Sequence, residues 1–173
     1  LTRARDDTGD NTDMALNRIW VYAEAADGKV APITLEMLTK ARELAGTVEA
    51  VYGDGDADAV AEALGAHGAS KVYATGDLQG HTPAVPVASA MAKLIEGGDT
   101  PDLILFGTTY EGRDVAARLS VALDKPVITN NTDIAVEDDA VVLTEPVCGG
   151  TKLVRTKFTT AGPYVALIRP ESF

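Results

Sequence analysis

The stretch that decides the fold is residues 101–128, PDLILFGTTYEGRDVAARLSVALDKPVI. Residues 103–107 are a short apolar run, which indicates a strand that is buried on both faces. Residues 113–123 are predicted to form a helix, and a short strand is predicted at 127–128. The apolar face of that helix consists of Val115, Ala116, Leu119, Ala122 and Leu123. A strand, a helix and a second strand in this order indicate a parallel crossover unit with a right-handed connection.

The same alternation extends toward the amino terminus. Strands are predicted at residues 19–25, 48–52 and 71–74, and helices from Thr34 onward, at 58–66 and at 84–96. A turn at 27–29 separates the first strand from the first helix, whose apolar face is Met37, Leu38, Ala41, Leu44 and Ala45. Thr34 is expected to cap this helix and Gly46 to follow its end, whereas Pro86 is expected to interrupt the helix at 84–96.

The segment after residue 132 lacks helices. Short strands are predicted at 133–136, 140–143, 153–158 and 164–168, joined by the turns Asp138-Asp139, Gly149-Gly150 and Gly162-Pro163. We therefore predict an α/β fold, an open, parallel, Rossmann-like sheet flanked by helices, which an antiparallel segment closes at the carboxyl end. Residues 14–173 would form this single domain, and the polar residues 1–13 a flexible tail.

Composition narrows the range of partners. The 173 residues carry 15 Lys and Arg against 26 Asp and Glu, a formal net charge of -11, so nucleic acid and anionic membranes are not expected partners. No apolar run approaches the roughly 20 residues that span a bilayer. Cys148 is the only cysteine, which fits a reducing compartment and predicts the cytoplasm or an organelle matrix.

The loop that follows the strand at 103–107 is the candidate site. Thr108 and Thr109 offer hydroxyl groups, Gly112 is flexible, and Arg113 lies at the start of a helix. Ligands of open α/β sheets bind where strands end and helices begin, so these four residues are candidates for a cofactor or phosphate. In the alternative interpretation, Asp114 only favours the helix dipole and Gly112 only turns the chain.

Other motifs are weaker. Residues 53–58, GDGDAD, lack the third glycine of a dinucleotide fingerprint and the glycine and glutamate of a calcium loop, so helix capping is the preferred interpretation. Residues 149–152, GGTK, are predicted to form a hairpin turn rather than a phosphate loop. His67 and His81 lack metal-ligand spacing, and Cys148 is interpreted as a packing residue. No catalytic residue and no metal site are predicted.

Basic side chains alternate with apolar ones near the carboxyl end. Arg155, Lys157 and Arg169 are interpreted as a solvated face, and the alternative is an edge that meets an acidic partner.

Five segments lie in order from Ile19 to Phe173: IWVYAEAADGKVAPITLEMLTKARELAG, GASKVYATGD, PDLILFGTTYEGRDVAARLSVALDKPVITNNTDI, EPVCGGTKLVRTKF and PYVALIRPESF. Taken together, they resemble the amino-terminal domain of the electron-transfer flavoprotein alpha subunit. The resemblance implies an α/β domain related to nucleotide alpha-hydrolase-like folds. It also implies a beta-subunit partner and service in electron transfer from flavin dehydrogenases to an acceptor.

The family carries FAD mainly on a second, carboxy-terminal domain with a glycine-rich signature, which this sequence does not contain. The resemblance therefore implies a scaffold and a subunit interface, with FAD held by the complete assembly rather than by this domain alone. No FAD ligand is carried over. The chain would be a fragment of an alpha subunit or a shorter relative, an electron carrier subunit rather than a catalyst by itself. The alternative function is a stand-alone nucleotide-binding α/β domain.

Overall fold

The computed structural model describes residues 16–53 and 55–173. The predicted tail at 1–13 lies outside this part of the chain. Among the described residues, no helix has the length and apolar character needed to span a bilayer.

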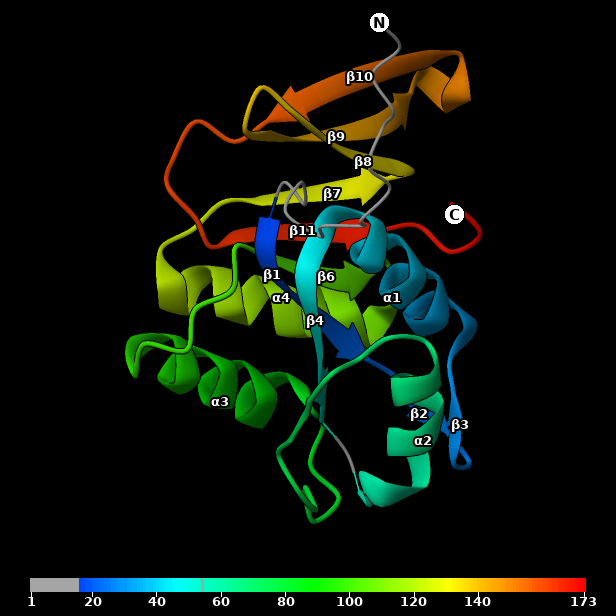
Figure 1. Cartoon of the computed structure of the whole chain (residues 1–173), viewed down its shortest axis with the longest axis vertical. Helices are drawn as coiled ribbons and strands as arrows, with labels where there is room; N and C mark the ends of the chain where they lie inside the picture. The colour runs from blue at the N-terminus through cyan, green and yellow to red at the C-terminus, as the bar shows by residue number, and fades with distance from the viewer. Residues whose placement is uncertain (1–15, 54) are drawn as a thin grey trace, which may run out of the picture.

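A six-stranded parallel sheet forms the centre of the molecule, in the strand order β5-β4-β1-β6-β11-β7 (Figure 1). Its strands are β1 (Leu16–Ala23), β4 (Ala45–Tyr52), β5 (Val72–Ala74), β6 (Leu103–Gly107), β7 (Val127–Asn131) and β11 (Tyr164–Ile168). The predicted turn at 27–29 is present and joins the short strands β2 (Ala25–Ala26) and β3 (Lys29–Val30) into a hairpin.

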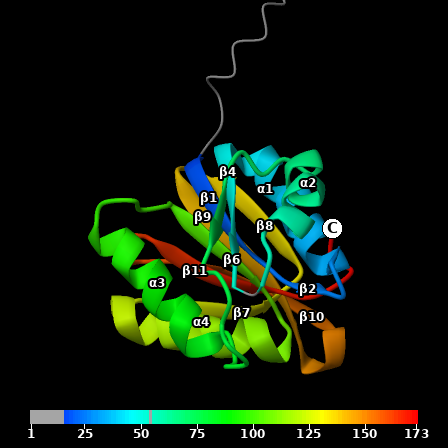
Figure 2. The same ribbon diagram turned by 90° about the horizontal axis from the view of Figure 1, so that it is seen from below.

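Four helices cover the sheet: α1 (Pro32–Leu44), α2 (Asp58–Ala66), α3 (Ala84–Glu96) and α4 (Tyr110–Leu123). Helices α3 and α4 lie on one side of the sheet and α1 and α2 on the other (Figure 2). Alternate residues of β1 point to the two sides. Ile19, Val21 and Ala23 pack with α1 and α2, whereas Trp20 and Tyr22 pack with α3 and α4.

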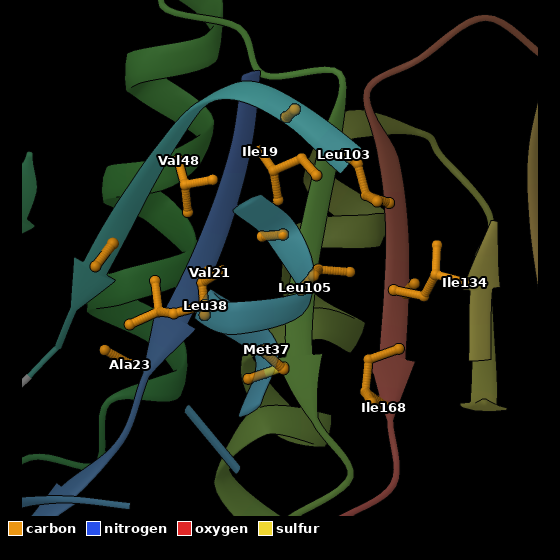
Figure 3. Packing of buried hydrophobic residues seen from close by; sticks show 14 of the residues in the cluster. Ile19, Val21, Ala23, Met37, Leu38, Val48, Leu103, Leu105, Ile134 and Ile168 are labelled. Carbon is orange, nitrogen blue, oxygen red and sulfur yellow. The ribbon is translucent and has the colours of Figure 1, made fainter. Parts of the chain in front are cut away.

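The side of the sheet that carries α1 is also covered by an antiparallel sheet, in the order β10-β9-β8 (Figure 1). Its strands are β8 (Asp133–Glu137), β9 (Ala140–Val147) and β10 (Lys152–Lys157). A short 3-10 turn, Cys148–Gly150, joins the last two, so the predicted hairpin turn is confirmed. Ile134 of β8 packs toward Ile168 and the residues of β1 and α1 in one core (Figure 3).

The prediction that residues 164–168 belong to the antiparallel segment is wrong. This strand, β11, is parallel and lies between β6 and β7 in the main sheet. The four residues from Val165 to Ile168 are all buried. An apolar run of this kind suits an interior strand covered on both faces, and the burial of these four side chains is the physical reason that the chain returns to the sheet.

The boundaries of α1 differ from the predictions at both ends. The helix begins at Pro32, which is pre-shaped for a first helical position, and Thr34 lies inside the helix instead of capping it. Gly46 does not follow the helix as a left-handed cap, because β4 begins directly at Ala45.

Two further helices differ from the predictions near their starts. Pro86 does not interrupt α3, since it lies in the first turn, where backbone N–H groups have no acceptor within the helix and a missing one costs no helical hydrogen bond. Helix α4 begins at Tyr110, three residues before the predicted start.

Candidate functional site at the carboxyl edge of the sheet

The candidate site lies where β1 and β6 end. The chain runs from β1 through α1 to β4 on one side, and β6 lies on the other side of β1. This reversal of strand order is the place where open α/β sheets form their ligand crevice. Glu24 follows β1 directly, and Thr108 and Thr109 follow β6.

Thr109 links the two strand ends. Its hydroxyl oxygen accepts a hydrogen bond from the backbone N–H of Gly112 at 2.8 Å, which makes Thr109 the cap of α4. The same hydroxyl donates to Oε1 of Glu24 at 2.9 Å. A single side chain therefore fixes the start of α4 and orients the carboxyl group of Glu24.

Two glycines, Gly107 at the end of β6 and Gly112 in the first turn of α4, allow the helix to approach the strand end closely. A Cβ atom on Gly112 would overlap the backbone oxygen of Gly107 and would lie 3.3 Å from Oε1 of Glu24. A Cβ atom on Gly107 would lie 3.2 Å from the same carboxyl oxygen. The carboxyl group of Glu24 therefore fills the space that the absent side chains leave.

Two carboxyl groups meet at this edge. Burial raises the pKa of Glu24 to about 7, the hydrogen bond from Thr109 opposes the rise, and the negative charge of Glu111 adds to it. Glu111 lies in the first turn of α4 and accepts a hydrogen bond from the hydroxyl of Tyr22 at 2.6 Å. The site can thus hold and release a proton near neutral pH. Within the described residues, no group of three or more acidic, histidine or cysteine side chains could hold a metal ion.

Three of the four predicted site residues lie together. Thr109 and Gly112 form the helix cap, and the side-chain oxygen of Thr108 is buried without a hydrogen-bond partner among the described residues. Arg113 is exposed. A cavity of about 240 Å³ adjoins this edge, between the starts of α3 and α4, lined by Thr82, Pro83, Ala84, Tyr110, Glu111 and Asp114.

Glu24, Tyr22 and Glu111 also belong to this site, and none of them was predicted from the sequence. A usable signal was the position of Glu24, a carboxyl group placed directly after an apolar strand that the fold makes central.

The remaining motifs take structural positions. Asp56 accepts a hydrogen bond from the backbone N–H of Asp58 at 2.9 Å just before α2, but the capping prediction is wrong, because the N-cap residue is Ala57 and no side chain caps the helix. His67 is the cap residue directly after α2, and His81 lies in the loop before α3.

Two predictions concern the antiparallel sheet. The interpretation of Cys148 as a packing residue is wrong, because this cysteine is exposed in the turn between β9 and β10. Arg155 and Lys157 are exposed on β10, and Arg155 pairs with Glu137 of β8, so a solvated face is confirmed for these two residues. Arg169 is exposed too, but it follows β11.

The chain is similar in sequence to a known protein family and to several of its members. Residues 19–173 match the family described as electron transfer flavoprotein domain. The chain is 32% identical over 162 residues to the electron transfer flavoprotein subunit alpha of Megasphaera elsdenii, a match that covers 90% of this chain and 48% of that protein. It is 29% identical over 153 residues to the corresponding subunit of Syntrophomonas wolfei, with 87% of this chain and 47% of that protein covered.

Protein FixB of Rhizobium meliloti is 29% identical over 163 residues, with 88% of this chain and 46% of that protein covered. The chain thus spans about half the length of the curated relatives it matches. The α/β architecture and the family match agree over nearly all of the described residues, and the chain belongs to the electron transfer flavoprotein family.

Proposed function

We propose that the chain acts as the amino-terminal domain of an electron transfer flavoprotein alpha subunit. In this role it supplies a scaffold and a subunit interface, and the complete assembly carries electrons from flavin dehydrogenases to an acceptor through FAD. The observation that carries the proposal is the family match over residues 19–173. The chain is a carrier component and not a catalyst by itself, and we place the assembly in the cytoplasm, or in the mitochondrial matrix of a eukaryote.

The expected partner is a beta subunit, and the edge of the antiparallel sheet is the surface that we propose for it. Among the described strands, β10 pairs with β9 along one edge only. Leu153 and Val154 are adjacent on β10, so their side chains point to opposite faces of the strand. They are 67% and 40% exposed, so neither face of β10 is fully covered at this point. An edge strand that exposes apolar side chains, here two among basic residues, is a surface that another chain can cover.

Co-expression with the beta subunit of its own organism tests this proposal. We expect a complex that elutes as one species in gel filtration, and we expect Leu153→Asp to weaken it. The matched control is Val121→Asp on the outer face of α4, where Val121 is 83% exposed and far from β10 in sequence. Absence of a complex with the unaltered chain would overturn the proposed partner, and equal loss by both variants would overturn the proposed surface.

Flavin binding is proposed to need more than this domain. We expect the purified chain to be colourless after incubation with FAD and gel filtration. We expect yellow protein only when the carboxy-terminal half of an alpha subunit and a beta subunit are supplied. A stoichiometric flavin absorbance in the chain alone would instead make it a stand-alone flavin carrier.

The buried hydroxyl of Thr108, which has no hydrogen-bond partner within the described residues, favours a second candidate function. In this alternative the chain binds a nucleotide by itself, with Thr108, Thr109, Gly112 and Arg113 around the phosphate. A ligand at about 100 times its dissociation constant adds about 2.7 kcal/mol to stability, which a melting curve resolves. The candidate fails if ATP, AMP and FAD all leave the melting temperature unchanged.

A further inference from the structure

Three aromatic side chains that can be oxidised by one electron form a contiguous group beneath α3 and α4. Trp20 and Tyr22 are alternate residues of β1, are completely buried, and belong to the same core cluster. A step of two residues advances about 7 Å along a strand and returns to the same face, so the rings of Trp20 and Tyr22 are neighbours on one face of the sheet. Tyr73 of β5 packs against Trp20, with 5.1 Å between the ring centres.

Each of the three rings donates a hydrogen bond to a carboxylate. The indole N–H of Trp20 donates to Oε2 of Glu49 at 2.8 Å. The hydroxyl of Tyr73 donates to Oδ2 of Asp99 at 2.6 Å and lies 3.2 Å from Oε2 of Glu49.

The third ring has the same kind of partner at the other end of the group. The hydroxyl of Tyr22 donates to Oε1 of Glu111 at 2.6 Å. A phenol or indole that loses an electron becomes a strong acid, so a hydrogen-bonded carboxylate at each ring is the feature that lets the proton leave together with the electron.

The two phenol groups have their proton acceptors at opposite ends of the strands. Asp99 precedes β6, at the amino edge of the sheet, whereas Glu111 follows β6, at the carboxyl edge. We propose that these three rings form a path on which Trp20 passes an electron vacancy to Tyr73 or to Tyr22. The path uses only side chains of this chain and does not depend on the proposed flavoprotein function.

The elementary step balances in electrons and protons. An outer-sphere one-electron oxidant removes an electron from Trp20, and the indole proton passes to Glu49, which leaves a neutral indolyl radical. An electron then moves from Tyr73 or Tyr22 to that radical, and the indole nitrogen regains its proton from Glu49. The phenol proton moves to Asp99 or to Glu111. The products are an intact indole, a neutral phenoxyl radical and one protonated carboxyl group.

Charged groups around Tyr73 keep its phenol protonated before oxidation. Burial, the hydrogen bond to Asp99 and the charges of Glu49 and Asp99 raise the pKa of Tyr73 far above its usual range. Arg18 pairs with Asp99, and Lys71 lies 3.9 Å from the centre of the Tyr73 ring and 3.9 Å from Oδ2 of Asp99. The hydrogen bond from Tyr73 and the charges of Arg18 and Lys71 hold the pKa of Asp99 below its usual range, so this carboxyl group is ionised and is placed to accept the phenol proton on oxidation.

The sequence makes this path easy to test, because Trp20 is the single tryptophan of the chain and there are five tyrosines. A flash at the red edge of the indole absorption, which tyrosine does not absorb, photoionises Trp20, and a cobalt(III) ammine complex takes up the ejected electron. Transient absorption then distinguishes the indolyl from the phenoxyl radical. We expect the indolyl signal to decay as the phenoxyl signal grows, with one rate that does not change with protein concentration.

Conservative variants identify the rings. Tyr22→Phe and Tyr73→Phe together keep both rings but remove both hydroxyl groups, and we expect loss of the phenoxyl signal and a persistent indolyl radical. Tyr110→Phe is the matched control, since Tyr110 is 93% exposed and lies outside the group, and it should leave the kinetics unchanged. Far-ultraviolet circular dichroism verifies that each variant is folded.

Three results would overturn the proposal. The first is a lack of phenoxyl radical in the unaltered chain. The second is phenoxyl formation at the original rate in the double variant. The third is a rate that rises with protein concentration, which would mean transfer between molecules.

Discussion

At the residue scale, a substitution at Gly112 tests how closely α4 packs against the end of β6. A Cβ atom there would overlap the backbone oxygen of Gly107, which cannot move aside as a flexible side chain can. We expect Gly112→Ala to lower the free energy of unfolding by about 1–3 kcal/mol, as overpacking typically does. Urea unfolding followed by circular dichroism measures the change.

The matched control for that substitution is Gly65→Ala. Gly65 lies near the end of α2, and a Cβ atom there would have no atom within 4 Å among its described neighbours. Because alanine favours a helix, this variant should be as stable as the unaltered chain or more stable by up to about 1 kcal/mol. Equal destabilisation by both variants would mean that the close contact at Gly112 is not the cause.

The raised pKa of Glu24 predicts how the free energy of unfolding changes with pH. Its pKa is raised from 4.5 to about 7, so between these values the folded state binds the proton and the unfolded state releases it. The stabilising contribution is complete below about pH 4.5 and is lost as the pH rises through about 7. We expect the difference in unfolding free energy between the unaltered chain and Glu24→Gln to change in this window, with the variant gaining relative stability as the pH rises. Urea unfolding at a series of pH values measures the difference, and a constant difference from about pH 4 to about pH 8 would contradict the assignment.

At the element scale, we expect the sheet to tolerate disruption of the interior strand β11 poorly. Ala166 is completely buried between β6 and β7, so Ala166→Asp would bury an unpaired charge. We expect this variant not to reach the native fold, or to lose more than about 4 kcal/mol of stability, which single substitutions rarely do. The contrast is Leu153→Asp on the edge strand β10, which should change stability by about 0.5 kcal/mol or less. Thermal unfolding of the two variants compares them, and a cooperative native transition for Ala166→Asp at the temperature of the unaltered chain would contradict the central role of β11.

The elements themselves could largely be predicted, whereas their neighbours in space could not. Periodicity identifies α1 and α4 because buried residues recur at three- and four-residue steps, as Leu38 and Ala41 do in α1 and Val115 and Leu119 in α4. The order of segments does not reveal that residues 164–168 insert between β6 and β7, because preceding hairpins make a further hairpin the simplest continuation. The apolar run at Val165–Ile168 was the one local sign that this strand is buried on both faces.

The candidate site shows the same division. Thr109 and Gly112 could be predicted because they follow a buried strand and begin a helix. Their contact with Glu24 could not, since the two side chains that meet, Thr109 and Glu24, are 85 residues apart in the sequence. Only the pairing of β1 with β6 brings them together.

At the scale of the whole molecule, the net charge of -11 predicts a response to salt. The screening length falls from about 30 Å at 0.01 M to about 8 Å at 0.15 M ionic strength, so repulsion among exposed carboxylates weakens. We expect the melting temperature to rise over this range. Calorimetry at several sodium chloride concentrations measures it. A fall would mean that ion pairs such as Arg18 with Asp99 outweigh the repulsion.

The position of β11 determines when the molecule can become complete during synthesis. On the ribosome, β1, β4, β5 and β6 emerge first and can pair with one another, but β7 joins the main sheet only through β11, which is made last among the described strands. Until residue 168 has left the exit tunnel, β6 presents an open edge that other nascent chains can pair with. Truncated products that stop before Tyr164 should therefore aggregate or be degraded, and chaperone demand should be greatest just before the end of translation of this domain.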